Sequence, residues 1–416
     1  MFPPNLARLL ALLLLATLAA CAATPRTGRA GDGPAHPLLL VSLDGVHPDT
    51  LFRGDSPNLD ALARRGVRAE AMRPSYPSLT FPNHYTLVTG LRPDRHGIVD
   101  NRMRDPVLGR FSLSDREAVS DGRWWQGGEP IWVTARRHGL RSATMFWPGA
   151  EARIHGVRPG EWSAFDAALP IEARVDRVLG WLGRPPSARP HLLTLYFEHV
   201  DTAGHDHGPG SETIRASLRE LDAAIGRLLD GIEARGLAGQ VNLVLVSDHG
   251  MAPIDPARTV FFEDLPGGAL AEPVHLGSQA GFNPRPGQAA ALAAAMPGRH
   301  GPVQCWRKQD LPARWHFGGH PRIPALYCQA DTGWRIQSRV RGAGNKRGAH
   351  GYDPADPSMA ALFVADGPGL ADGRVLPAFD NVHVHALLLE LLDLPAMPGT
   401  DADPAVLRPA LSAGSR

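Results

Sequence analysis

The chain has 416 residues, which is enough for one large α/β domain carrying an insertion or for two ordinary domains. Hydrophobic residues make up 43% and charged residues 20%, a globular composition that excludes a disordered chain and one embedded in a membrane. The 43 Lys and Arg nearly balance the 42 Asp and Glu, so the formal net charge of +1 argues against a broad basic surface for long nucleic acids.

The first twenty residues predict a signal peptide. Arg8 precedes an unbroken run of apolar or small residues from Leu9 to Ala20, which suits a signal-peptide core and is too short to span a bilayer. The run ends in Leu18-Ala19-Ala20-Cys21, which resembles the lipobox of bacterial lipoproteins. We therefore expect an exported protein, periplasmic or anchored to the outer membrane through a lipidated Cys21. Ordinary secretion with an incidental Cys21 is the alternative. Residues 21–37, polar and rich in Gly and Pro, predict a flexible tether.

Four short apolar runs, at 38–43, 192–197, 241–246 and 360–364, predict buried strands. Runs of this length that are apolar on both faces are typical of a parallel sheet covered by helices on both sides. The runs lead into Asp44, into Glu198 and Asp201, into Asp248, and into Asp366, respectively. Because ligands of open α/β sheets bind at the carboxyl ends of the strands, these acidic residues are candidates for a functional site.

Three segments between or after these runs predict helices. Ile214, Leu218, Leu221, Ile225, Leu228 and Ile232 repeat at helical spacing, and Gly236 is placed to end that helix. A second helix is expected over 382–392, before Pro395. A third begins near Thr80, because Pro82 suits a helix start and Gly90 a helix end. Thr80 therefore lies where free backbone N–H groups favour anionic oxygen, although a simple N-cap role is the alternative.

Three carboxylates and three imidazoles follow the predicted strands. The set predicts two zinc-like ions held by oxygen and nitrogen, and the absence of thiolate ligands argues against a structural zinc site. Such ligands also accept manganese or iron, so the metal stays open. Each residue alone has an ordinary interpretation as a cap, surface or core residue; their joint occurrence carries the hypothesis. The set comprises Asp44, Asp201, His205, Asp248, His249 and His350.

The order of these residues resembles the nucleotide pyrophosphatase/phosphodiesterase family of the alkaline phosphatase superfamily, as a bacterial exported member. The resemblance covers nearly the whole mature chain and rests on several separate blocks. The blocks are Leu43-Asp44-Gly45, Pro77-Ser78-Leu79-Thr80-Phe81-Pro82-Asn83-His84, Gly97-Ile98-Val99-Asp100-Asn101, Glu198-His199-Val200-Asp201-Thr202-Ala203-Gly204-His205, Ser247-Asp248-His249-Gly250-Met251 and His350-Gly351-Tyr352.

This resemblance implies an alkaline-phosphatase-like α/β fold with a mostly parallel central sheet, helices on both faces and an inserted lobe. The catalytic domain is expected over 38–396, with the insertion at about 252–345 and a flexible tail at 397–416. Cys305 and Cys328 fall inside the insertion, and an oxidising compartment permits them to pair, but the sequence does not establish that they do.

By the same resemblance, one zinc ion is held by Asp201, His205 and His350, and the other by Asp44, Asp248 and His249 together with Thr80. Thr80 is then the nucleophile of a double displacement through a phospho-threonine, with Asn101 and the Thr80 backbone N–H as donors to the phosphoryl oxygens. Phe81 is placed to stack on a base or another leaving-side group, with a packed helical residue as the alternative. His199 stands where the family usually has Pro, and its position beside the site leaves substrate contact open.

Charge accounting favours a diester substrate. Two zinc ions carry four positive charges, which three carboxylates and one alkoxide cancel, so a nearly neutral site suits a singly charged diester.

The leading hypothesis is a two-zinc phosphodiesterase/nucleotide pyrophosphatase that releases nucleoside monophosphates. The alternatives are a phospholipid- or choline-type phosphodiesterase, then a phosphate monoesterase, or a metal- or nucleotide-binding surface lipoprotein without turnover. A sulfatase is disfavoured because the nucleophile lacks the Cys/Ser-x-Pro-x-Arg context. The preferred nucleotide and the oligomeric state stay open.

Overall fold

The computed structural model describes residues 34–413. The expected signal peptide, the lipidated Cys21 and the tether up to residue 33 lie outside the described residues. Within the described residues, no helix is both long and apolar enough to cross a membrane.

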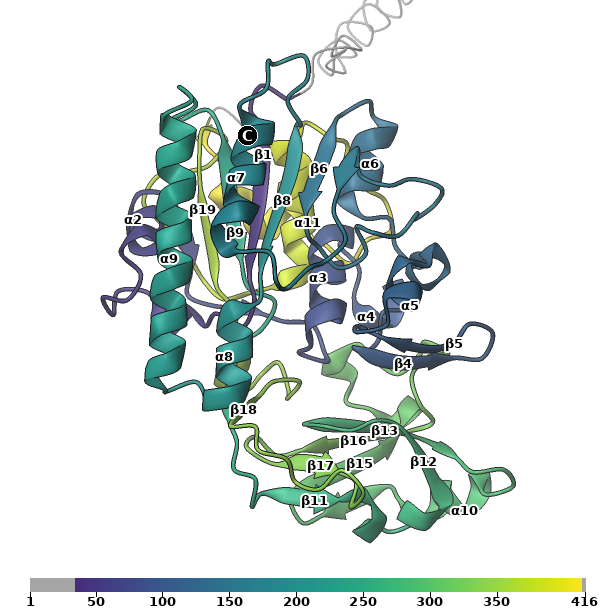
Figure 1. Ribbon diagram of the computed structural model, residues 1–416. Helices are drawn as coiled ribbons and strands as arrows, with labels where there is room; N and C mark the ends of the chain where they lie inside the picture. The colour runs from purple at the N-terminus through teal and green to yellow at the C-terminus, as the bar shows by residue number, and fades with distance from the viewer. Residues whose placement is uncertain (1–33, 414–416) are drawn as a thin grey trace, which may run out of the picture.

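An eight-stranded sheet forms the centre of the main domain (Figure 1). Five of its strands, β9, β1, β8, β6 and β7, run parallel to one another in that order. This arrangement confirms the expected mostly parallel sheet. In spatial order the strands are β20 (Arg374–Leu376), β2 (Val67–Ala69), β19 (Phe363–Asp366), β9 (Asn242–Val246), β1 (Leu38–Leu43), β8 (Leu192–Phe197), β6 (Ser142–Met145) and β7 (Glu161–Trp162).

The central strand β1 shows why the sheet needs two covering layers. Leu38 and Leu40 belong to the apolar core on one face, whereas Leu39, Val41 and Leu43 belong to the core on the other. Each of these side chains is fully buried, because successive residues of a strand point to opposite faces. The continuous apolar run therefore encodes a strand covered on both sides.

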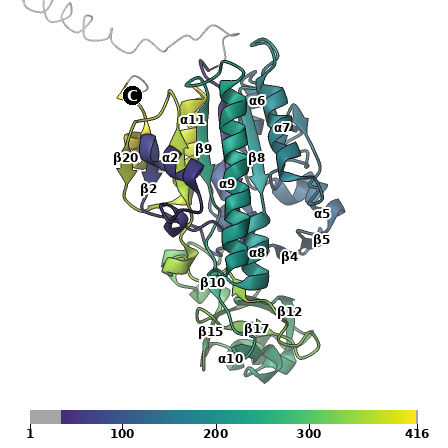
Figure 2. The same cartoon turned by 60° about the vertical axis from the view of Figure 1, so that its left-hand side comes forward.

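Helices cover both faces (Figures 1 and 2). One face packs against α2 (Pro57–Arg65), α7 (Ile171–Leu182) and α9 (Glu212–Glu233). The other face packs against α3 (Thr80–Thr89), α6 (Ile131–Arg137) and α11 (Val384–Leu391). The main domain also contains α4 (Pro93–His96), α5 (Arg116–Ser120) and α8 (His199–His207). The expected helices correspond to α3, α9 and α11, although the last is shorter than predicted.

One strand expected to be parallel runs the other way. β19 pairs antiparallel with both β9 and β2. Its end therefore lies at the opposite edge of the sheet from Asp44 and Asp248, and Asp366 forms an ion pair with Arg65 there. The grouping of the 360–364 run with the other three was wrong, because strand direction depends on how the connection crosses the sheet, which an apolar run does not reveal.

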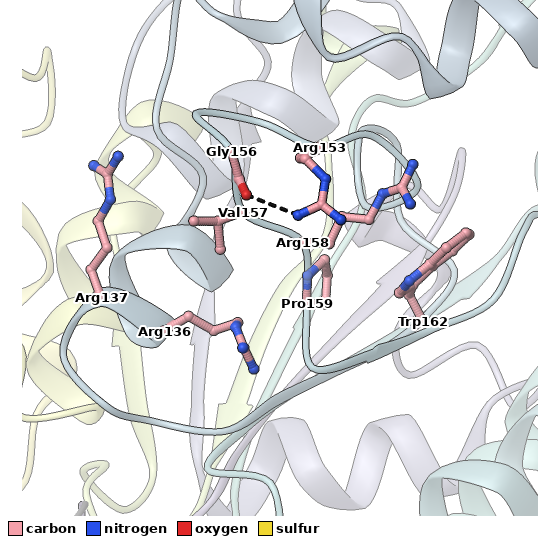
Figure 3. Close-up of a pocket in the computed structure, with 8 residues that line it drawn as sticks. All are labelled: Arg136, Arg137, Arg153, Gly156, Val157, Arg158, Pro159 and Trp162. Carbon is pink, nitrogen blue, oxygen red and sulfur yellow. Dashed lines mark hydrogen bonds between the residues drawn. The ribbon is translucent and has the colours of Figure 1, made fainter.

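A loop returns the chain from the carboxyl end of β6 to the amino end of β7. It lies beside the end of α6 (Figure 3). Gly160 closes it against the first residue of β6, donating its N–H to Ser142 Oγ over 3.4 Å.

Residues between β9 and β19 build a second lobe below the sheet edge where β1, β8 and β9 end (Figure 1). Its apolar core has its own buried residues, among them Phe282, Leu292 and Val303. Its five-stranded sheet contains, in spatial order, β12 (Ala271–His275), β13 (Gln279–Pro284), β16 (Leu326–Ala330), β15 (Val303–Arg307) and β14 (Gly298–His300). It is accompanied by α10 (Ala289–Ala295) and by the pair β11 (Thr259–Phe261) and β17 (Arg335–Gln337).

Aromatic packing fixes this lobe to the main domain. Tyr76 stacks on Trp315 with ring centroids 4.0 Å apart, and its hydroxyl donates to Gln329 over 2.7 Å. Phe317 and Tyr327 complete the aromatic group. The lobe is therefore held in one position beside the carboxyl edge of the sheet.

Two small ribbons extend the main domain. They are β4 (Arg102–Asp105) with β5 (Gly109–Ser112), and β3 (Met72–Arg73) with β21 (Phe379–Asp380). The part of the expected flexible tail that the structure describes, 397–413, is not an extended tail. It contains α12 (Pro404–Leu407), buries Leu407 and Ala410, and pairs Asp401 with Arg95. Its small, polar composition hid the few apolar residues that pack against the core.

Cys305 and Cys328 form a disulfide between neighbouring strands β15 and β16, with 23 residues of sequence separation. A crosslink across such a loop restricts the unfolded chain, so Cys305→Ser should lower the free energy of unfolding by about 3 kcal/mol. Chemical denaturation with and without reductant measures this. Reductant should destabilise the unsubstituted protein and leave Cys305→Ser unchanged; equal stability of the two oxidised proteins would contradict the prediction.

Candidate active site

Three aspartates meet because three parallel strands end side by side. Asp44 follows β1, Asp248 follows β9, and Asp201 lies in α8, directly after β8. Gly45 fits between them with φ +73°, a conformation that favours glycine, and a Cβ there would approach Asp201 Cα to 3.0 Å. Its N–H donates to Asp248 Oδ1 over 3.3 Å. The chain turn at Gly45 therefore packs the carboxylates closely.

The negative charge of these carboxylates is not fully balanced by donors within the protein. Asp44 and Asp248 are buried, and Asp201 is largely so. One oxygen of each, Asp44 Oδ1, Asp201 Oδ1 and Asp248 Oδ2, is buried without a hydrogen-bond partner. Burial, followed by repulsion from Asp248 and Asp201, raises the pKa of Asp44 well above its ordinary value. Three neighbouring buried side chains of this kind can all stay ionised only if cations lie beside them.

Three histidines present lone pairs to the carboxylates. The Nδ1 atoms of His205, His249 and His350 each lie 2.9 Å from a backbone carbonyl oxygen. Since a carbonyl only accepts, each Nδ1 carries the proton and donates it, and each Nε2 keeps a free lone pair. Metal-ligating histidines are held in this way by a hydrogen bond from the other ring nitrogen.

The ligand atoms form two adjoining clusters. In the first, His205 Nε2 and His350 Nε2 lie 3.6 and 3.7 Å from Asp201 oxygens and 3.1 Å from each other. In the second, His249 Nε2 lies 3.0 Å from Asp248 Oδ2 and 3.6 Å from Asp44 Oδ1. Two lone pairs facing each other at 3.1 Å need a proton or a cation between them. The orphaned oxygens, the tautomers and the spacing all fit metal ions.

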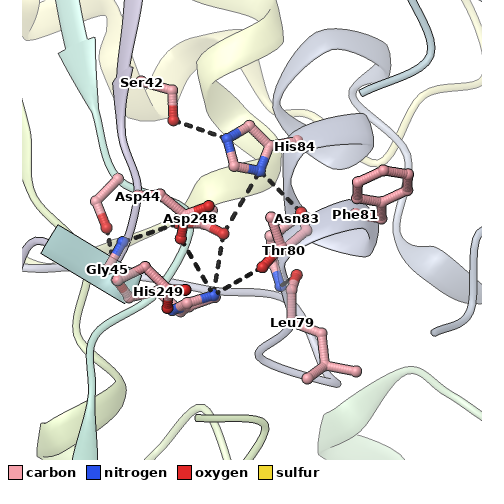
Figure 4. A network of polar contacts seen from close by, with 12 residues as sticks. Ser42, Asp44, Gly45, Leu79, Thr80, Phe81, Asn83, His84, Asp248 and His249 are labelled. Carbon is pink, nitrogen blue, oxygen red and sulfur yellow. Dashed lines mark hydrogen bonds and ion pairs between the residues drawn. The ribbon is translucent and has the colours of Figure 1, made fainter. Parts of the chain in front are cut away.

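His84 is a site residue that the sequence did not identify (Figure 4). It is fully buried, and Nδ1 lies 2.8 Å from Thr80 O and 3.4 Å from Asp248 Oδ2. Its Nε2 lies 2.7 Å from Ser42 Oγ. Since both ring nitrogens have partners within the protein, His84 is suited to orienting Asp248 rather than to binding a metal, although its distances to Asp44 and Asp248 alone would allow a third ligand group.

Tyr196 is a second supporting residue. Its hydroxyl donates to Asp44 Oδ2 over 2.6 Å. Burial, and then the charge of Asp44, raise the pKa of Tyr196 well above its ordinary value, so the phenol stays protonated and donates. Tyr196 thereby fixes one oxygen of Asp44 and leaves the other directed at His249.

Thr80 is the first residue of α3, and Leu79 is its N-cap. A simple capping role for Thr80 therefore does not apply. Its Oγ1 lies 3.4 Å from His249 Nε2, beside the second cluster (Figure 4). In this first turn Phe81 N donates to Asn101, Pro82 has no N–H, and the Thr80 N–H has no acceptor within the described chain. An unpaired donor at a helix N-terminus favours a negatively charged oxygen.

Asn101 lies beside the same helix turn. The Phe81 N–H donates to its Oδ1 over 2.9 Å, and this contact identifies the oxygen, so the amide Nδ2 is left to donate elsewhere. The preceding Asp100 accepts from Arg102 N on one oxygen and from Gln279 of the lobe on the other, over 2.8 and 2.7 Å. The lobe thus supports the segment that carries Asn101.

The other two predicted residues lie at the edge of the site. Phe81 is half-buried and contacts the rings of Phe111 and Trp125. Figure 4 shows its ring directed away from the carboxylates. His199 opens α8, and its Nδ1 is buried without a hydrogen-bond partner. The structure brings Phe81 and His199 near the ligand residues without a contact to them.

A short ribbon at the base of the lobe completes the first cluster. β10 (Ala252–Pro253) pairs with β18 (Gly348–Ala349), directly after His249 and directly before His350. The pairing stacks the two imidazoles with ring centroids 3.6 Å apart. The lobe therefore leaves and rejoins the main domain at the ligand residues themselves.

Comparison with known proteins identifies relatives of this arrangement. The family model described as type I phosphodiesterase / nucleotide pyrophosphatase matches residues 38–353. The chain is 38% identical over 376 residues to an uncharacterized pyrophosphatase/phosphodiesterase of Schizosaccharomyces pombe, covering 87% of this chain and 78% of that protein. It is 37% identical over 379 residues to human ectonucleotide pyrophosphatase/phosphodiesterase family member 1, covering 87% of this chain and 40% of the human protein. The chain thus spans less than half of that human relative.

A solved structure shares the fold. Murine ectonucleotide pyrophosphatase/phosphodiesterase 5 superposes with a TM-score of 0.86 at 30% identity, covering 91% of this chain and 100% of the murine chain. It was solved in an inactive form with a threonine-to-alanine substitution, in complex with AMP. The human counterpart gives the same TM-score.

The Tyr196 contact generates a prediction about metal binding. Tyr196→Phe removes the donor to Asp44 without changing the shape of the core, so divalent-metal affinity should fall roughly 10- to 100-fold. Competition with a chromophoric chelator measures it. Tyr85→Phe is the matched control, because that buried hydroxyl donates to backbone carbonyls in the core. Equal metal affinity in the two variants would rule out the role assigned to Tyr196.

Proposed function

The chain belongs to the type I phosphodiesterase / nucleotide pyrophosphatase family of the alkaline phosphatase superfamily, and we propose that it hydrolyses nucleotide phosphodiester or phosphoanhydride bonds through a phospho-threonine on Thr80. The products are nucleoside monophosphates. The observation that carries the proposal is the position of the Thr80 hydroxyl, between an unpaired helix N-terminal N–H and the Nε2 of His249.

Two divalent metals, zinc in the simplest case, belong to this proposal. Asp201, His205 and His350 would hold one. Asp44, Asp248 and His249, with Thr80, would hold the other. When bound, such ions supply positive charge to the attacking and leaving oxygens of an in-line displacement. Their four charges balance three carboxylates and one alkoxide.

The chain's own residues perform the remaining tasks. The Thr80 hydroxyl proton passes to solvent water, and Oγ1 forms the new bond to phosphorus while the bond to the leaving oxygen breaks and the leaving group departs. The Thr80 N–H and the Asn101 amide donate to the phosphoryl oxygens, where negative charge builds up. His249 Nε2, which would hold a metal ion, lies 3.4 Å from Thr80 Oγ1, so this ligand and the nucleophile belong to the same cluster. Water then cleaves the phospho-threonine and restores Thr80.

A nucleotide diester is the substrate class that the site supports best. The nearly neutral ligand set carries no arginine of its own, so a singly charged diester is balanced by Asn101 and a backbone N–H, whereas a doubly charged monoester is not. The names of the relatives and the AMP complex of the murine structure support a nucleotide.

Export is also part of the proposal. The Cys305–Cys328 disulfide is consistent with folding in an oxidising compartment, since such bonds are rare in the cytosol of mesophiles. Lipidation of Cys21 would then tether the domain to a membrane from outside.

Removal of the Thr80 hydroxyl should abolish catalysis. Thr80→Val keeps the shape of the side chain and should lower kcat/KM on a nitrophenyl nucleotide diester by at least ~10³-fold, because the nucleophile is lost. Thr80→Ser retains a hydroxyl and should retain measurable turnover. Steady-state kinetics of zinc-loaded protein on this diester and on nitrophenyl phosphate make the test. Activity preserved in Thr80→Val would mean direct attack by water, and equal turnover of the two esters would overturn the diester preference.

Asn101 should act on kcat more than on KM. Asn101→Asp keeps the acceptor for the Phe81 N–H, and therefore the helix turn, but replaces the free amide donor with negative charge. The kcat on the diester should fall roughly 10²- to 10³-fold, the usual effect of losing one oxyanion donor. A change confined to KM would assign Asn101 to substrate binding alone.

A further inference from the structure

A second polar hollow lies at the opposite edge of the main sheet (Figure 3). Its volume is about 430 Å³, and we name it the arginine pocket. The loop before β7 and the end of α6 form its walls, at the amino ends of β6 and β7, whereas the aspartate clusters lie at the carboxyl ends of the parallel strands. Its lining residues are Arg136, Arg137, Arg153, Gly156, Val157, Arg158, Pro159 and Trp162.

Four arginines and no acidic residue line the pocket. Arg137 forms an ion pair with Glu129. In the described chain, Arg136, Arg153 and Arg158 have no acidic partner within ion-pair distance. The nearest acidic residue of β7, Glu161, is occupied by Arg184 and by the Trp181 indole N–H. The positive charge of the pocket is therefore not neutralised from within the protein.

Contacts within the pocket position two of the guanidinium groups, those of Arg158 and Arg153. Arg158 lies over the ring of Trp162, 4.8 Å from its centroid, and its Nε is buried without a hydrogen-bond partner. Arg153 donates from Nη1 to the Gly156 carbonyl over 3.0 Å, so its other N–H groups stay available. Arg136 lies against the turn at Gly160, where a Cβ would approach its Nη1 to 3.1 Å. A buried donor without an acceptor in the protein is open to an acceptor from outside, either a water or an anion.

Arginine forks match the oxygens of a phosphate group, with two parallel N–H···O bonds from one guanidinium. A hollow lined by one sign of charge also concentrates the field and attracts ions of the other sign. A single carboxylate would balance only one of the three unpaired charges, whereas a phosphate carries up to two charges and three or four acceptor oxygens.

We propose that the arginine pocket binds a phosphate-bearing anion through Arg136, Arg153 and Arg158, at a site separate from the one that performs hydrolysis. The phosphate belongs either to a free soluble ion or to the headgroup of an anionic phospholipid. Both sources present the same oxygens to the same guanidinium groups.

The test compares charge-removing variants in the full zinc-loaded protein. Calorimetric titration with inorganic phosphate should give two binding events in the unsubstituted protein, and phosphate inhibition of diester hydrolysis identifies the one at the active site. Arg136→Gln/Arg158→Gln should weaken the second event at least tenfold and leave the inhibition and the rate of hydrolysis unchanged. Arg215→Gln/Arg227→Gln is the matched control, because it removes the same charge from exposed, paired arginines of α9.

Co-sedimentation with vesicles of phosphatidylglycerol or of phosphatidylcholine separates the two sources. If the unsubstituted protein and the control variant bind phosphatidylglycerol vesicles and the pocket variant does not, the ligand is a lipid headgroup. If no protein binds vesicles and only the pocket variant loses the second phosphate-binding event, the ligand is a soluble ion. A single phosphate event together with no variant-dependent vesicle binding would overturn the proposal, as would equal losses in both double variants. A protein inactive on the diester that still shows the pocket event would refute the proposed function and leave the pocket standing.

Discussion

The concentration of three carboxylates at one sheet edge is the constraint on which the structure depends. Asp44, Asp201 and Asp248 are each left with a buried oxygen that no protein group satisfies. Burying such charges is unfavourable unless cations or donors compensate them. The surrounding groups are arranged accordingly: Tyr196 donates to the second oxygen of Asp44, His84 lies beside Asp248, and three imidazole lone pairs face the carboxylates. Stability and reactivity are thus opposed at this edge, since the fold accepts an electrostatic cost that bound metal ions would remove.

The lobe is part of that arrangement. The short β10–β18 ribbon joins His249 to His350 across the base of the lobe, and Gln279 reaches Asp100 beside Asn101. Tyr76 and Trp315 hold the two parts together by stacking. The insertion therefore positions a ligand residue, His350, and supports the segment that carries Asn101. Movement of the lobe would separate His350 from His205, because the two belong to different sides of this junction.

The arginine pocket and the aspartate clusters lie at opposite edges of the same sheet and have opposite charge. The chain is nearly neutral as a whole, yet each of these two sites gathers charge of one sign. Net charge excluded a broad basic surface, but it could not reveal a local one. The two edges would give a bound or anchored protein a defined orientation, with the hydrolytic site directed away from the surface that the pocket contacts.

The sequence by itself determined the buried strands, the ligand residue types and the helix start at Thr80, because each depends on local periodicity or on neighbours along the chain. Only the tertiary structure decided strand direction, and so Asp366 belongs to the other edge. It also decided which histidines can bind metal: His84 and His249 differ not in type but in the partners of their ring nitrogens. The same holds for Tyr196, for the packed residues of 397–413 and for the Cys305–Cys328 bond. These depend on contacts between segments far apart in the chain, and no local pattern encodes them.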